Sequence, residues 1–207
     1  WAAMQTLETG DAAAAERAVA MTLDHAGEQG FGTWLALGEV CRARLVLEHD
    51  TPAAAVAAIE KALARVKESG SRVFEAHALS LQGDALRRLG RHDEAGVRMA
   101  EATRLIETGG ARWMEADVLR RRALCEHDRG DTTTAFLTLE AAIEVARRQE
   151  ARMLELRATV DLARLRADQG EPEPGAALLA RCLAGLTEGF ETRDLREAKT
   201  LLDSLER

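Results

Sequence analysis

The sequence predicts an all-α protein built from consecutive antiparallel helix pairs, and three observations lead to this prediction. Hydrophobic residues make up 46% of the chain but aromatic residues only 3%, with no Tyr, which is typical of closely packed helices rather than sheets. A repeat of 40 residues runs from Phe31 to Phe190 without an insertion. A turn signal breaks each repeat near its middle. We therefore expect two helices in every repeat.

The repeat divides the chain into segments of defined length. Four full repeats cover residues 31–70, 71–110, 111–150 and 151–190, and residues 1–30 form a partial repeat. Residues 191–207 are predicted to form a capping helix, because Leu195, Ala198, Leu201 and Leu205 lie on one helix face. The segments together are predicted to be a single domain over residues 1–207.

Small, turn and bulky residues recur at fixed positions of each repeat. Gly at the central turn suits the left-handed conformation that ends a helix, and Thr51 or Asp131 can cap the next one. Pro52 and Pro172 fall in the first turn of that second helix, where a missing N–H costs little. Small residues act as spacers between two helix backbones, and bulky ones fill the gap. The positions in register are Ala43, Gly83, Ala123 and Ala163 (small), Asp50, Gly90, Gly130 and Gly170 (turn), and Ile59, Met99, Leu139 and Leu179 (bulky).

This order of residues, as in Gly83, Gly90, Ala95, Met99 and Ala102, resembles the tetratricopeptide repeat (TPR). That family usually has about 34 residues per repeat, so the additional residues would lengthen the helices where one repeat passes to the next. The resemblance implies a TPR-like right-handed superhelix with the first helices on its concave side. A HEAT- or armadillo-like array, in which repeats of about 40 residues are usual, is the alternative.

The end of the chain is similar to a family of bacterial signalling proteins. These proteins join a nucleotide cyclase or another output module to a STAND-type ATPase and a long TPR array. The resemblance implies that the chain is the C-terminal regulatory region of such a protein. It rests on Thr187-Glu-Gly-Phe-Glu-Thr-Arg-Asp-Leu-Arg-Glu-Ala-Lys-Thr-Leu-Leu202, Phe31-Gly-Thr-Trp-Leu-Ala, Gly110-Ala-Arg-Trp-Met-Glu-Ala, Ala146-Arg-Arg-Gln and Leu154-Glu-Leu-Arg-Ala.

Charge and cysteine content argue against several classes of protein. A net charge of -7 disfavours a nucleic-acid binder, and no apolar run is long enough to cross a bilayer. Cys41, Cys125 and Cys182 show no CxxC spacing and read as buried thiols, so we expect a cytoplasmic protein. Phosphate-loop, dinucleotide and HExxH motifs do not occur. We therefore expect no enzyme activity, no cofactor and no metal site.

The predicted function is non-catalytic protein–protein interaction, with a small-molecule inducer-sensing domain as the alternative. In the TPR pattern, the groove residues lie six and three positions before the small residue and one, four and five after it. An Arg-rich groove would receive a partner's carboxylates, unless these side chains pair with one another instead. The run Arg120-Arg121-Arg122 has Asp117 and Glu126 within helical reach. The candidate partner-binding residues are Arg44, His77, Asp84, Arg87, Arg88, Asp117, Arg120, Arg157 and Arg164.

Overall fold

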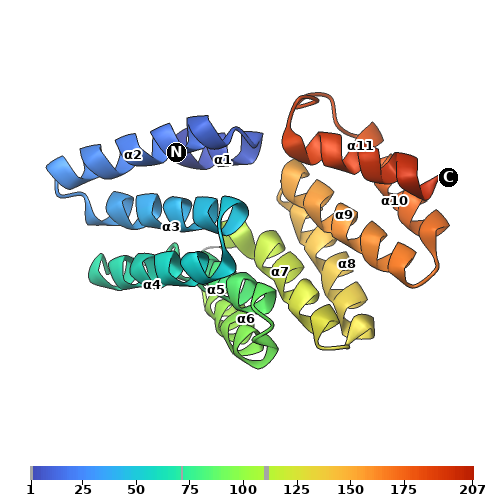
Figure 1. Cartoon of the computed structure of the whole chain (residues 1–207), viewed down its shortest axis with the longest axis horizontal. Coiled ribbons are helices and arrows are strands. Elements are labelled where there is room, and N and C mark those ends of the chain that lie inside the picture. The colour runs from blue at the N-terminus through green and yellow to red at the C-terminus, as the bar shows by residue number, and fades with distance from the viewer. Residues whose placement is uncertain (1, 71, 110–111) are drawn as a thin grey trace. The chain divides into compact units, whose positions relative to one another are not determined.

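A computed structural model describes residues 2–70, 72–109 and 112–207, and the described part of the chain is helical (Figure 1). It contains no strand, which confirms the all-α prediction. Two of the predicted repeat starts, at residues 71 and 111, lie outside the described residues, as do residues 1 and 110. The helices are α1 (Ala2–Thr9), α2 (Ala12–Glu28), α3 (Gly32–His49), α4 (Pro52–Glu68), α5 (Glu75–Arg88), α6 (His92–Glu107), the 3-10 helix η1 (Arg112–Met114), α7 (Glu115–Asp128), α8 (Thr132–Arg148), α9 (Arg152–Asp168), α10 (Pro172–Ala184) and α11 (Arg193–Leu205).

The helices form two compact units, which we call unit 1 (Trp1–Met114) and unit 2 (Glu115–Arg207). In unit 1 consecutive helices from α1 to α6 pack against one another, and α3 also contacts α1 and α5. In unit 2 the helices α7 to α11 pack in the same consecutive way, and α9 also contacts α7 and α11. The right-handed superhelix and the single continuous domain stay predictions.

Turn chemistry decides where the helices end. Gly90, Gly130 and Gly170 have φ angles of 73°, 85° and 81°, which confirms the predicted left-handed turn after α5, α7 and α9. Asp50, which follows α3, is extended instead, with a φ of -127°. The Thr51 hydroxyl accepts a hydrogen bond from the backbone N–H of Ala54 (3.2 Å), and the Asp131 carboxylate accepts one from Thr134 (3.1 Å). Both predicted N-caps are therefore confirmed.

A second set of left-handed residues ends the second helices and was not predicted from the sequence. Gly30 and Gly70 have φ angles of 68° and 67°. Glu150 lies in register with them, with a φ of 54°, and is the one non-glycine residue with positive φ in the described chain. An L side chain is strained in this region, whereas glycine is not. The turn after α8 therefore carries backbone strain that the other two turns avoid.

Close helix approach confirms the spacer role of the small residues at two positions. A Cβ added at Gly83 would lie 2.7 Å from the Cε atom of Met99 on α6. A Cβ added at Gly175 on α10 would lie 3.0 Å from the carbonyl oxygen of Ala163 on α9 and 3.2 Å from its Cα. Residues at these helix crossings must therefore be small.

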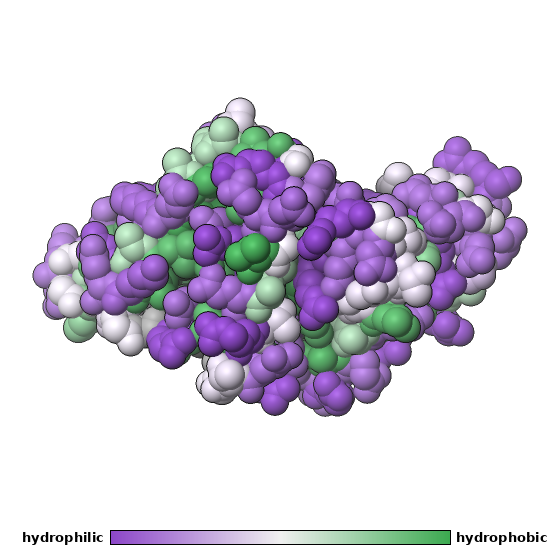
Figure 2. All heavy atoms as spheres, turned by 90° about the horizontal axis from the view of Figure 1, so that it is seen from below, coloured by the Kyte–Doolittle hydropathy of each residue, from purple (hydrophilic) through white to green (hydrophobic). Residues whose placement is uncertain are grey.

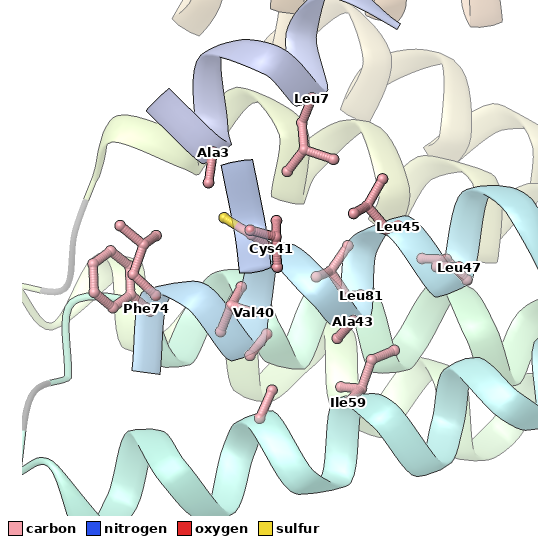
Figure 3. Close-up of a cluster of buried hydrophobic side chains, with 14 of the residues drawn as sticks. Ala3, Leu7, Val40, Cys41, Ala43, Leu45, Leu47, Ile59, Phe74 and Leu81 are labelled. Atoms are coloured by element: carbon pink, nitrogen blue, oxygen red, sulfur yellow. The ribbon is translucent and has the colours of Figure 1, made fainter. Parts of the chain in front are cut away.

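The core of unit 1 lies between α1, α3, α4 and α5 (Figure 3), where Leu7, Val40, Ile59 and Leu81 are buried together. Every residue of α5 from Ala76 to Leu86 is buried, polar ones included. A helix buried on all sides leaves its polar side chains no water, so each needs a partner inside the protein. The predicted groove residues His77 and Asp84 lie in this buried stretch, so their polar groups need partners within the protein.

The core of unit 2 continues to the C-terminal helix. Leu195 and Ala198 of α11 are buried against Leu156 on α9 and Leu179 on α10. Leu201, Leu202 and Leu205 pack around the same cluster. The apolar stripe predicted for this helix therefore faces α9 and α10.

Candidate functional site

The predicted groove residues of unit 1 are held by contacts between helices. Arg44 of α3 is buried, and its Nη1 donates to Glu8 of α1 (2.5 Å) while its Nε donates to Glu48 (2.8 Å). Arg44 thereby ties α1 to α3. The two carboxylates offset the free-energy cost of burying the guanidinium charge.

His77 of α5 is also buried, and an aromatic residue covers it. The indole ring of Trp113 lies 5.9 Å from the imidazole ring and meets the ring of Phe74 edge-on at 6.2 Å. His77, Trp113 and Arg44 line one small cavity of about 10 Å³. This volume is about that of one water molecule, so the cavity has no room for an effector.

Asp84 organises the next cluster of predicted residues. Its buried carboxylate accepts hydrogen bonds from Arg87 (2.8 Å) and Arg88 (2.9 Å) on the same helix. Arg88 also donates to the backbone carbonyl of Leu47 in the last turn of α3 (2.8 Å), a group that has no partner within its own helix. Arg88 thus links α5 to α3.

Asp117 and Asp161 hold the corresponding cluster in unit 2. The buried Asp117 carboxylate accepts from Arg120 (3.0 Å) and Arg121 (2.8 Å), and Arg120 also donates to Asp161 of α9 (2.7 Å). Arg164 lies 3.6 Å from the same Asp161 carboxylate, with 48% of its side chain exposed. Arg122 pairs with Glu126, so the arginine run is a salt-bridged face.

Arg157 stands apart from these clusters. Its Nε donates to Asp194 of α11 (2.6 Å), so it fastens the C-terminal helix to α9. All the predicted arginines therefore pair with carboxylates of their own chain, which is the arrangement that sequence reasoning had left open. Arg88 and Arg164 keep the most exposed side chains of the set, and partner binding there stays a prediction.

An open groove on the surface of unit 2 was missed by sequence reasoning. It lies along α8, α9 and α10 and encloses about 420 Å³. Ile143 and Leu162 form its buried floor. We call this the outer groove, and the residues that line it are Glu140, Ile143, Arg147, Leu162, Arg166, Pro174, Ala177, Leu178 and Arg181.

Three arginines line the rim of the outer groove. Arg147 donates to Glu155 (2.7 Å), and Arg166 lies over the ring of Phe136 and near Glu140 (3.5 Å) and Glu171 (3.4 Å). Arg181 is exposed and forms no ion pair with any residue that the structure describes. This site was hard to predict from the sequence, because Glu140, Ile143 and Arg147 have the spacing of any solvated helix face.

Several large apolar side chains outside the outer groove are also exposed. Figure 2 shows one face of the molecule, on which hydrophilic side chains predominate and apolar ones form small patches. Val97 and Leu137 occupy the same repeat position as Ala177 on their second helices, and both are more than half exposed. Single exposed residues of this kind are common on protein surfaces.

Cys41 and Cys182 have no activating surroundings. Burial raises the pKa of Cys41 to about 11, and burial also raises the pKa of Cys182. A thiol with a raised pKa stays protonated at neutral pH and is a poor nucleophile. The described part of the chain also holds no group of three His, Cys, Asp or Glu side chains arranged to bind a metal ion.

None of the helices in the described residues is long and apolar enough to cross a membrane. Comparison with known proteins gives no matching protein-family model and no matching curated protein.

Proposed function

We propose that this chain is a non-catalytic helical-repeat scaffold that binds another protein or a peptide segment. The outer groove of unit 2 is the observation that carries the proposal. Its apolar floor under a charged rim matches the general make-up of a protein-binding patch. The groove is open, and its floor is formed by consecutive helices of one packed unit.

The ion pairs support a structural role for the first helices. Arg44, Arg88, Arg120 and Arg157 each reach a group on a neighbouring first helix or on α11. Such links hold neighbouring helices in fixed positions, as a scaffold requires. The outward faces of the second helices then remain for a partner.

We further propose that the array is of the TPR type and belongs to the C-terminal part of a bacterial STAND-ATPase signalling protein. The sequence resemblance described above supports this, together with the order of helix hairpins and left-handed turns. The partner would then be another domain of the same signalling protein, or a protein that such a domain recruits.

Binding experiments with two kinds of ligand test the proposal. Pull-down with the other domains of the signalling protein should recover a polypeptide that binds with saturable affinity. Calorimetry against a panel of metabolites should give no heat of binding, because the cavity beside Trp113 has only about 10 Å³ and the larger outer groove is open to solvent. Saturable binding of a metabolite without any polypeptide partner would overturn the scaffold function in favour of inducer sensing.

A further inference from the structure

We propose that the outer groove binds an amphipathic α-helix of a partner polypeptide whose first turn is acidic. This inference rests on the scaffold function proposed above and adds the class of partner. Groove length, backbone chemistry and charge each support it.

The groove has the length of a short helix. On α8 it is lined by Glu140, Ile143 and Arg147, and on α10 by residues from Pro174 to Arg181. These positions recur at three, four and seven residues, so the groove follows each helix for about two turns, or about 10 Å. A partner helix with apolar residues at the same spacing can lay them along the floor.

Backbone chemistry favours a helix over an extended peptide. The lining residues all belong to α-helices, whose interior N–H and C=O groups are already paired within each helix. The groove therefore offers no strand edge to which an extended peptide could add. A helix brings its own backbone hydrogen bonds and needs only side-chain contacts.

Charge distinguishes the two ends of the groove. The chain as a whole carries a net charge of -7, yet the groove lining holds three arginines and one glutamate. Arg147 and Arg181 lie late in α8 and α10, which run in the same direction because antiparallel α9 separates them. Arg166 lies late in α9, next to Glu140 at the other end.

The basic end therefore selects an acidic segment. Arg181 has no ion pair with any described residue, and Arg147 is about half exposed beside its contact with Glu155. Carboxylates of a partner can pair with both guanidinium groups. Acidic residues are also favourable in the first turn of a helix, because they complement its dipole. The partner's first turn should therefore lie over Arg147 and Arg181.

A displayed library of random 16-residue peptides can test this inference on the full chain. Enriched peptides are then titrated by fluorescence anisotropy against three variants. Ala177→Arg fills the exposed wall of the groove, and Arg181→Glu reverses its free charge. Arg196→Glu is the matched control, because Arg196 is exposed on α11 and does not line the groove. Circular dichroism and melting curves establish that each variant folds.

Enriched peptides should carry apolar residues at helical spacing and Asp or Glu in their first turn. They should gain helical circular dichroism on binding. Ala177→Arg and Arg181→Glu should lower the affinity for these peptides by about 10-fold or more, while Arg196→Glu should change it by less than about 2-fold. Peptides that bind all three variants equally would overturn the groove inference and leave the scaffold function standing. Failure to enrich any peptide would count against both.

Discussion

Gly83 on α5 lies so close to Met99 on α6 that a Cβ added at residue 83 would come within 2.7 Å of the Met99 Cε atom. At Gly175, in contrast, the nearest atoms belong to the backbone of Ala163 at 3.0 and 3.2 Å. A methionine side chain can change rotamer, whereas the backbone of a packed helix cannot move alone. A Cβ at residue 83 would therefore meet a flexible side chain, whereas a Cβ at residue 175 would meet a helix backbone.

Gly83→Ala and Gly175→Ala should consequently differ in stability. Both changes gain up to about 1 kcal/mol of helix propensity. We expect Gly83→Ala to change the free energy of unfolding by less than about 1 kcal/mol, because Met99 can adjust. Gly175→Ala should lose about 1 to 3 kcal/mol through overpacking against α9. Urea denaturation measures both, and an equal or larger loss at Gly83 would contradict this explanation.

Glu150→Gly should stabilise the protein. Glu150 holds a φ of 54°, where its side chain is strained, and the residues in register, Gly30 and Gly70, avoid that strain. We expect a gain of about 0.5 to 1 kcal/mol, seen as a higher melting temperature, after part of the gain is offset by the freedom of glycine in the unfolded chain. Gly130→Ala, at a φ of 85°, is the reciprocal control and should lower the melting temperature. A less stable Glu150→Gly variant would show that this turn carries no strain.

Arg120 and Arg164 contact the same carboxylate but should contribute very differently to stability. The Arg120 side chain is 15% exposed and joins Asp117 to Asp161, whereas Arg164 is 48% exposed and 3.6 Å from Asp161. Arg120→Ala leaves the buried Asp117 with one arginine fewer and should cost about 1 to 3 kcal/mol. Arg164→Ala should cost at most about 0.5 kcal/mol. Similar losses in chemical denaturation would mean that the cluster is not structural.

Deleting residues 192–207 should cause self-association. The deletion removes α11 and uncovers Leu156 and Leu179, which are fully buried in the complete chain. An exposed apolar helix face tends to pair with a second copy. Light scattering after size-exclusion chromatography should show a mass that rises with concentration. A truncated chain that stays monomeric, with unchanged stability, would argue that α11 is not a cap.

Periodic features of the chain could be predicted from its sequence. The helix hairpins, the left-handed turns at Gly90, Gly130 and Gly170 and the N-caps at Thr51 and Asp131 all depend on local backbone chemistry. That chemistry depends on residues that are neighbours in the sequence, and the repeat of 40 residues presents it several times. The left-handed turn at Glu150 was missed because residue 150 is a glutamate, whereas the residues in register, Gly30 and Gly70, are glycines.

Contacts between repeats could not be predicted in the same way. Arg88 bonds to Leu47 and Arg120 to Asp161, in each case across 41 residues. Such pairs depend on how one helix lies against the next, and no local pattern sets that packing. The outer groove was missed for a related reason, since its floor becomes apolar only when Ile143 and Leu162 from two helices meet.

Amide hydrogen exchange, measured on the full chain alone and with its tightest-binding polypeptide partner, would locate the binding surface. A scaffold that uses the outer groove should show slower exchange in residues 140–147 of α8 and 174–181 of α10, with no change in α3 and α5. The same protection should be lost in Ala177→Arg. Slower exchange confined to α3, α5 and α7 would contradict the outer groove as the binding surface. Slower exchange produced by a metabolite and by no polypeptide would contradict the scaffold function.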